Sequence, residues 1–475
     1  MDLPTLAPVG SAAVTFGGPA VAVASGISLL FLKSVLSNQN GSPSHLPSVP
    51  EVPGLPLVGN LLDLKEQKPY KTFTRWAETY GPIYSIKTGA TSMVVVNSNQ
   101  IAKEAMTVKH NLLTSFLGPA ARKRHRAHRD AMADNLSTQL HALAPNSHHQ
   151  PVNLREIFQS QLFSLAFKQT FGKDIESIYV SDLGITMTRD EMFQILVIDP
   201  LMGAIEVDWR DFFPYLKWIP NTKFEDKIEQ MYIQRKAVMN ALIQQHRKRI
   251  DSGEILESYI DYLVSEAQPL TEEQLIMSLW EPIIETSDTT MVTTEWAMYE
   301  LSKHPKKQEL LYNEIRNVCG LEKITEEKLC KMPYLSAVFH ETLRVHSPVA
   351  IIPLRYVHEN TQLGGYHVPA GTELAVNIYG CNMEKEMWEN PEEWSPERFL
   401  AENEQINLQK TMAFGAGKRV CAGAMQAMLL ACVGIGRMVQ EFEWRLKDDV
   451  EEDVNTLALT TQKLNPMLAV IKPRN

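Results

Sequence analysis

The sequence is poor in cysteine, has no excess of basic residues and carries no internal repeat. Its five cysteines are odd in number and form no CxxC pair, which argues against a disulfide framework or a zinc site and favours a reducing compartment. The chain has 46 lysines and arginines and 56 aspartates and glutamates, and the net charge of -10 argues against a nucleic-acid-binding protein. Because 44% of the 475 residues are hydrophobic, the chain can bury a sizeable core.

Charge is also missing from the N-terminal segment, where no charged residue occurs from Leu3 to Leu32. A run of this length is sufficient to cross a bilayer, and residues 19–36 form its best span. We therefore expect residues 1–37 to be an uncleaved anchor, with a cleaved signal or a plastid-type leader as the alternatives. Closely spaced prolines within residues 38–59 predict a stiff hinge between the anchor and a body that spans residues 60–475.

Local patterns in the body predict many helices and a few short strands. Two β-branched segments, at residues 83–86 and 93–96, are typical of a hairpin around Gly89. Residues 348–371 alternate β-like segments with turns, and residues 448–475 are predicted to be a strand-rich tail. The predicted helices cover residues 70–80, 99–106, 157–169, 227–250, 255–267, 275–301 and 424–442.

One cysteine stands in an unusual context, the run F-G-A-G-K-R-V-C-A-G. A thiolate in a tight loop before a helix receives backbone N–H dipoles, which lower its pKa and make Cys421 a candidate metal ligand. Gly415 and Gly423 lack the side chains that would keep a flat macrocycle away from the backbone. Arg419 can reach a carboxylate on that macrocycle, and Phe414 can pack beside the sulfur. The alternative is a buried free cysteine in a glycine-rich turn.

The predicted helix at residues 275–301 has the sequence E-T-S-D-T-T at its centre, beginning at Glu285. Threonine and serine hydroxyls can donate to carbonyl oxygens one turn earlier and open a helix locally. Pro282 precedes this sequence and is expected to cost a backbone hydrogen bond. Further along, Glu341 and Arg344 are three residues apart on a predicted helix, so they share a face and can pair.

Along the chain the E-T-S-D-T-T sequence comes first, the Glu341 and Arg344 pair second and the Cys421 loop last, and these motifs in that order resemble the cytochrome P450 family of haem-thiolate monooxygenases. The resemblance implies a mainly α fold with small β-sheets, in which Cys421 is the axial thiolate of a haem b iron. It also implies that Thr289 holds a proton network beside dioxygen and that Asp288 relays protons to it from solvent. Electrons are then expected from NADPH through a flavoprotein reductase in the same membrane.

The resemblance assigns roles to further residues. Arg398, in the motif P-E-R-F, is expected to join Glu341 and Arg344 in a buried network. Each arginine is expected to fork, donating two parallel hydrogen bonds to the glutamate carboxylate. The role of the network is structural rather than catalytic. Arg355 is expected to meet a haem propionate, with a plain surface arginine as the alternative. Glu285 stands where small residues usually lie in the family, which suggests a specialised pocket.

The sequence departs from the family pattern between Met106 and Thr107, where the family has an additional segment. The missing segment would hold the end of one helix, a substrate-contacting loop and the start of the next helix. His110 or Lys109 is expected to replace the basic residue that meets a haem propionate. A basic run at residues 122–129 is expected either to dock the acidic reductase or to form a solvated helix face.

Within the family, residues 70–106, 283–301 and 411–432 resemble plant enzymes of gibberellin biosynthesis that act on ent-kaurene. The likeness implies three successive oxidations of one methyl group of this apolar diterpene. It also implies a plastid outer envelope or endoplasmic reticulum membrane, with the body facing the cytosol. Two alternatives stay open: a haem-thiolate isomerase or dehydratase that needs no oxygen, and a shortened isoform that binds haem poorly. The pair of Asp288 and Thr289 argues against the first, and the shortened junction supports the second.

Overall fold

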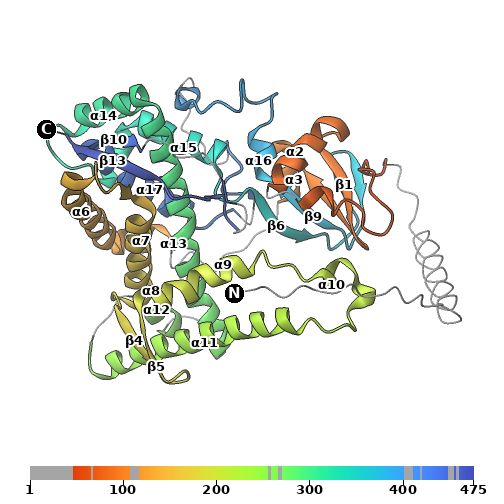
Figure 1. The fold of residues 1–475 in the computed structure, drawn as a ribbon, viewed down its shortest axis with the longest axis horizontal. Helices are drawn as coiled ribbons and strands as arrows, with labels where there is room; N and C mark the ends of the chain where they lie inside the picture. The colour runs from red at the N-terminus through yellow and green to blue at the C-terminus, as the bar shows by residue number, and fades with distance from the viewer. Residues whose placement is uncertain are drawn as a thin grey trace, which may run out of the picture.

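The computed structural model describes residues 46–65, 68–106, 117–254, 258–265, 270–400, 410–417, 420–447, 454–455 and 459–474. Strands β1, β6 and β9 lie with α2, α3 and α16 at one end of the molecule, whereas β4, β5, β10 and β13 lie among the helices at the other end (Figure 1). The expected mainly α fold with small β-sheets is confirmed. The predicted anchor lies outside the described residues, and none of the helices that are described is long and apolar enough to span a membrane.

The helices agree with most of the predicted ranges. The helix predicted at residues 275–301 begins earlier and ends later in the structure. Of the helix predicted at residues 255–267, the structure describes Tyr259–Ser265. The helices are α2 (Pro69–Tyr80), α3 (Asn99–Ala105), α5 (Pro119–Arg124), α6 (Arg126–Leu143), α7 (Leu154–Phe171), α8 (Arg189–Phe193), α9 (Asp199–Gly203), α10 (Trp209–Phe212), α11 (Thr222–Asp251), α12 (Tyr259–Ser265), α13 (Glu272–Lys303), α14 (Pro305–Cys319), α15 (Pro333–Val345), α16 (Ile378–Asn382) and α17 (Ala424–Glu441).

The largest sheet has the strand order β1-β2-β9-β6, in which β2 and β9 are parallel and the other neighbours antiparallel. The predicted hairpin is confirmed, and Gly89 has a φ of +66° in its turn. The strands are β1 (Ile83–Thr88), β2 (Thr91–Val96), β3 (Val152–Asn153), β4 (Ser177–Val180), β5 (Ile185–Thr188), β6 (Ile351–Tyr356), β7 (Thr361–Leu363), β8 (Tyr366–Val368), β9 (Glu373–Asn377), β10 (Phe442–Leu446), β11 (Val454–Asn455), β12 (Gln462–Lys463) and β13 (Leu468–Pro473).

Helix α13 passes through the middle of the molecule and packs on α7 and α17 (Figure 1). Thr271 caps its first turn, because its hydroxyl accepts the Gln274 N–H at 3.2 Å while the Gln274 side chain accepts the Thr271 N–H at 3.0 Å. The helix continues through Pro282, so the lost backbone bond does not end it. Trp296 is 1% exposed and anchors α13 in the main hydrophobic core.

The C-terminal tail, residues 459–474, returns to α13. The Thr461 carbonyl oxygen accepts the indole N–H of Trp296 at 3.1 Å. Glu295 is 1% exposed, and its carboxylate accepts the Met467 N–H and a guanidinium N–H of Arg155 on α7, both at 2.8 Å. This buried carboxylate therefore links α7, α13 and the C-terminal tail.

Candidate active site

The cysteine loop is closed by a backbone hydrogen bond in which the Cys421 N–H donates to the Phe414 carbonyl oxygen at 2.9 Å. Gly415 and Gly417 have φ values of +68° and +66°, in the left-handed region that side chains rarely adopt. Helix α17 begins at Ala424, so Cys421 is presented just before a helix N-terminus, as predicted.

Cys421 is exposed as a residue, whereas protein surrounds its thiol group. The residue is exposed by accessible area, yet burial is the largest influence on the pKa of its thiol, and it raises that pKa. The N–H groups of Gly423 and Ala424 donate toward the sulfur and lower the pKa, while the Glu285 carboxylate raises it. A metal cation at the sulfur would favour the thiolate there.

The other predicted residues of the loop contribute in different ways. Phe414 is half-buried, and its ring centroid lies 6.4 Å from that of Phe339 in the core. A Cβ placed on Gly423 would lie 3.7 Å from the Cys421 sulfur, which is an ordinary contact, so crowding by described protein atoms does not require glycine there. Three predicted cofactor contacts lie outside the described residues: Arg419, His110 and Lys109.

Hydroxyl groups along α13 donate to carbonyl oxygens one turn earlier, as the sequence predicted. Thr289 Oγ1 donates to the Glu285 carbonyl oxygen at 3.0 Å, and Ser287 Oγ donates to the Ile283 carbonyl oxygen at 2.6 Å. Ser287 is buried, whereas Thr289 is half-buried. Because residues four apart share a helix face, Thr289 lies on the same face as Glu285.

Asp288 is directed at the C-terminal tail. It is 2% exposed, and its Oδ2 accepts the Thr460 hydroxyl at 2.7 Å. Burial raises the pKa of this carboxyl, and the Thr460 hydrogen bond and the Arg155 charge oppose the rise. The proton-relay role of Asp288 stays a prediction; the structure shows that its carboxyl is buried and bonded to Thr460. Thr460 was missed because it is 172 residues further along the chain and no local pattern marks it.

Glu285 has a large solvent-accessible area, yet protein atoms surround its carboxyl group. Burial, assisted by the Glu281 charge, raises the pKa of its carboxyl to about 7. Within the described part of the chain its carboxyl oxygens have no hydrogen-bond partner. Its charge also acts on Cys421, so the two side chains are close enough to interact electrostatically. The sequence marked this residue as unusual without assigning it a role.

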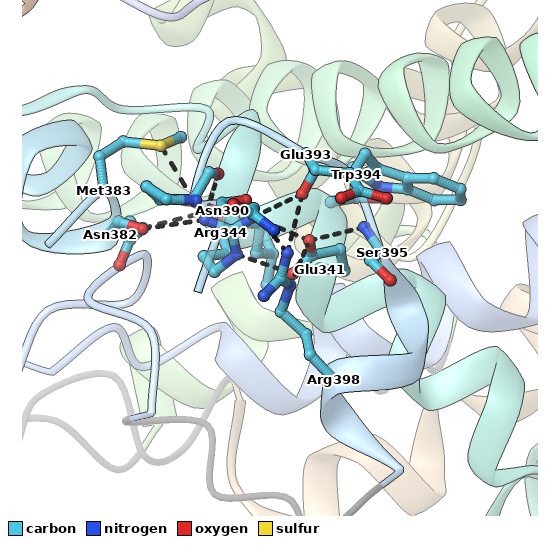
Figure 2. A network of polar contacts seen from close by, with 12 residues as sticks. Glu341, Arg344, Asn382, Met383, Asn390, Glu393, Trp394, Ser395 and Arg398 are labelled. Atoms are coloured by element: carbon cyan, nitrogen blue, oxygen red, sulfur yellow. Dashed lines mark hydrogen bonds and ion pairs between the residues drawn. The ribbon is translucent and has the colours of Figure 1, made fainter. Parts of the chain in front are cut away.

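The predicted network of Glu341, Arg344 and Arg398 is present (Figure 2). Glu341 and Arg344 have fully buried side chains, joined by two hydrogen bonds of 2.7 and 2.8 Å. The Arg398 Nε donates to the same carboxylate at 3.0 Å, and the Ser395 N–H does so at 2.8 Å. The expectation that both arginines fork is correct for Arg344 and wrong for Arg398, which makes a single bond.

Backbone carbonyl oxygens satisfy the remaining N–H groups of both arginines (Figure 2). Arg344 donates to the carbonyl oxygens of Asn382, Pro391 and Glu393, at 3.1, 2.7 and 3.0 Å. The Nη atoms of Arg398 are directed to the carbonyl oxygens of Glu389, Asn390 and Glu393. The network therefore fixes the segment at residues 382–398 against α15.

Arg355 and the basic run are placed as follows. Arg355 is half-buried on β6, opposite Leu374 of β9 and just after an irregularity in the pairing.

In the basic run, Arg129 is buried and pairs with Glu326 at 2.5 Å, and Arg126 pairs with Glu327. Part of the run therefore ties α6 to the short helix Glu326–Lys331, rather than forming an entirely solvated face.

The comparisons with known proteins agree with this arrangement. The family model described as Cytochrome P450 matches residues 49–126 and 107–470. The chain is 56% identical, over 501 positions, to Ent-kaurene oxidase from Salvia miltiorrhiza, with 98% of this chain and 96% of the relative covered. It is 48% identical to Ent-kaurene oxidase 2 from Oryza sativa subsp. japonica, with 95% and 97% covered. It is 46% identical to the rice Ent-sandaracopimaradiene 3-hydroxylase, with 90% and 91% covered.

Proposed function

We propose that this chain, which belongs to the cytochrome P450 family, oxidises the C19 methyl group of ent-kaurene in three steps to give ent-kaurenoic acid, a reaction of gibberellin biosynthesis. The family match makes the protein a haem-dependent monooxygenase, as predicted. The substrate is proposed from the two relatives named ent-kaurene oxidase, which cover at least 95% of the chain.

As a cytochrome P450, the protein uses haem iron, dioxygen and electrons that a reductase passes on from NADPH. Bound haem supplies the iron centre that oxidises an unactivated C–H bond. The described residues fit this cofactor, because the backbone N–H groups of Gly423 and Ala424 are directed at the Cys421 sulfur. We assign Cys421 as the iron ligand. The proposed propionate partners are Arg355, Arg419 and His110.

The observation that carries the proposal is that α13 and the cysteine loop lie close together, since α13 packs on α17, which follows the loop, and the Glu285 charge acts on the Cys421 thiol. An apolar substrate between them is close both to the cofactor site and to the Thr289 hydroxyl. We propose that Thr289 holds and passes protons on this face of α13. Asp288, bonded to Thr460, is proposed to support that proton transfer from within the protein.

We assign a structural role to Glu341, Arg344 and Arg398. Their network holds α15 and the segment at residues 382–398 together. Asn382 at the start of this segment accepts the Met412 N–H at 3.0 Å through its side-chain oxygen, and Met412 lies just before the cysteine loop. The network is therefore expected to keep the cysteine loop in position without contacting the substrate.

The test is a reduced, carbon-monoxide-bound difference spectrum, followed by turnover with ent-kaurene, NADPH and reductase. We expect a red-shifted, thiolate-type Soret band and the alcohol, aldehyde and acid of ent-kaurene as successive products. Cys421→Ser is expected to abolish the thiolate band; its retention would remove Cys421 as the ligand. A thiolate band without oxidation of ent-kaurene would refute the proposed substrate. Oxidation of ent-sandaracopimaradiene instead would favour the activity named for the rice hydroxylase.

A second candidate is a shortened isoform that binds haem poorly. An alignment of 501 positions that uses 98% of this 475-residue chain leaves roughly 35 positions of the Salvia relative without a counterpart. The two family-model matches overlap at residues 107–126, next to the junction at Met106–Thr107. These observations support a deletion at this junction. Absence of a thiolate band would favour this candidate over the oxidase.

We also propose the domain arrangement and location expected from the sequence. Residues 1–37 would anchor the chain, residues 38–59 would act as a hinge, and the body at residues 60–475 would face the cytosol. The membrane would be the plastid outer envelope or the endoplasmic reticulum. Imaging a C-terminal fluorescent fusion beside markers of both membranes tests this, and a fusion that remains soluble would contradict it.

A further inference from the structure

We propose that Thr460 is a positioning residue for Asp288, because its hydroxyl fixes one oxygen of the Asp288 carboxylate and leaves the other oxygen available for proton transfer. The inference rests on the proposed function, in which Asp288 supports proton transfer at Thr289 on α13. It adds a residue of the C-terminal tail that none of the motifs described above includes.

The contact between Thr460 and Asp288 joins two buried side chains. The Thr460 hydroxyl donates to Asp288 Oδ2 at 2.7 Å, and the two residues are 3% and 2% exposed. Within the described part of the chain, no other donor bonds to this carboxylate, so its Oδ1 accepts no hydrogen bond. Leaving a buried carboxylate without a hydrogen bond is costly, and Thr460 therefore favours one orientation of Asp288.

The charged neighbours of Asp288 are bonded to other groups. Arg155 on α7 and Glu295 on α13 both act electrostatically on the Asp288 carboxyl, with opposite signs. The Arg155 guanidinium donates to the Glu295 carboxylate and to the Lys463 carbonyl oxygen, both at 2.8 Å. Neither of these two side chains hydrogen bonds to Asp288. The orientation of Asp288 therefore depends on the Thr460 hydroxyl.

The next residue along the tail holds Thr460 in place. The Thr461 N–H donates to the Pro348 carbonyl oxygen at 2.7 Å, and its hydroxyl donates to the Ser347 carbonyl oxygen at 2.6 Å. In addition, the Thr461 carbonyl oxygen accepts the Trp296 indole N–H at 3.1 Å. The tail is therefore attached both to α13 and to the segment after α15, and a fixed backbone presents the Thr460 hydroxyl to α13.

This positioning affects how each oxidation uses its protons. Hydroxylation converts a C–H bond, dioxygen, NADPH and one proton into the alcohol, water and NADP+. Uncoupled turnover converts dioxygen, NADPH and one proton into hydrogen peroxide and NADP+. With Oδ2 bonded to Thr460, Asp288 can take up a proton at Oδ1 and pass it on. A misoriented Asp288 transfers this proton more slowly, so more of the NADPH yields peroxide.

The experiment compares Thr460→Val, which keeps the shape of the side chain without the hydroxyl, with Thr460→Ser, which keeps the hydroxyl. Both are measured as the haem-loaded full chain with reductase, NADPH and ent-kaurene. Loss of one hydrogen bond to a charged group typically changes an equilibrium by about tenfold or more. We therefore expect the ratio of product to peroxide to fall about tenfold in Thr460→Val and to recover in Thr460→Ser. The Kd of ent-kaurene and the thiolate Soret band should be unchanged in both.

Two further measurements separate positioning from a loss of stability. Thr294→Val removes the hydroxyl of another buried threonine, which donates to the Thr290 carbonyl oxygen at 2.8 Å on α13. This control is expected to lower the midpoint of urea unfolding and to leave the ratio of product to peroxide unchanged. The second measurement is a double-mutant cycle in urea at pH 7. Thr460→Val should be less destabilising in the Asp288→Asn background, because the amide carries no charge.

The outcomes distinguish this inference from the function on which it rests. A ratio of product to peroxide in Thr460→Val equal to that of the wild type overturns the inference, and so does an equally low ratio in Thr460→Ser. If the wild type has the thiolate band but forms no product from ent-kaurene, the proposed substrate is wrong and the double-mutant cycle decides alone. Coupling between Thr460 and Asp288 then supports the positioning role, whereas additive effects overturn it.

Discussion

Glu341→Gln removes one negative charge from the buried network while preserving the size of the side chain. The wild-type carboxylate accepts two hydrogen bonds from Arg344, one from Arg398 and one from the Ser395 N–H. A glutamine amide presents one oxygen and one NH2 group, so at least one arginine N–H loses its acceptor. The charge of Arg344, whose side chain is fully buried, then has no fully compensating partner.

Breaking a buried ion pair by removing one partner typically costs about 3–5 kcal/mol of the free energy of unfolding. Arg344 keeps three backbone carbonyl acceptors, so we expect the lower end of this range, about 3 kcal/mol. The assay is urea unfolding followed by tryptophan fluorescence. Trp388 is a local reporter, because the Arg344 guanidinium carbon lies 5.2 Å from its ring centroid.

A matched control and a double variant make this prediction decisive. Glu309→Gln removes a half-exposed glutamate that pairs with Arg474 at 2.9 Å, and its effect should stay below about 1 kcal/mol. Glu341→Gln combined with Arg344→Met should be less destabilised than Glu341→Gln alone, because no buried charge is left unpaired. If Glu341→Gln shifts the unfolding midpoint no more than Glu309→Gln does, the network contributes little and the reasoning is wrong.

Three other predictions concern the site and the junction. Thr289→Ala should uncouple NADPH consumption from product and release peroxide; coupling equal to that of the wild type would mean that another group manages the protons. Asp288→Asn keeps an acceptor for Thr460 and should slow turnover while raising stability at pH 7. The sign follows from burial, which raises the Asp288 pKa above 3.8, so wild-type stability is lost as pH rises through the raised value. The gain in the variant should therefore vanish in urea titrations below pH 3.8. Inserting the corresponding segment of the Salvia relative at Met106–Thr107 should raise haem content and turnover; unchanged values would show that the shortening is harmless.

The cysteine loop and the glutamate–arginine network could be predicted because their determinants are local. Gly415 and Gly417 are needed for the left-handed backbone of one turn, and Cys421 follows within the same loop. Glu341 and Arg344 are three residues apart on one helix, so their pairing follows from helical geometry. Only the addition of Arg398 needed the family resemblance.

The surroundings of Asp288 and Arg129 could not be predicted, because tertiary packing decides them. The composition of the E-T-S-D-T-T sequence does not reveal that Asp288 turns toward Thr460, since that contact depends on how the tail returns to α13. Likewise, the basic run suggested a surface feature, whereas Arg129 is buried against Glu326. A charge run in a sequence shows its sign but not its ion-pair partners.

The return of the C-terminal tail to α13 has a consequence for the timing of synthesis. Asp288 leaves the ribosome 172 residues before Thr460, an interval of roughly 9–34 s at typical elongation rates of about 5–20 residues per second. During this interval the Glu295 carboxylate also lacks its hydrogen bond from the Met467 N–H, because Met467 has not yet been synthesised. Helix α13 therefore acquires its complete set of buried partners only when almost the whole chain has been translated. Assembly of this site is a late event, although most of its residues are made early.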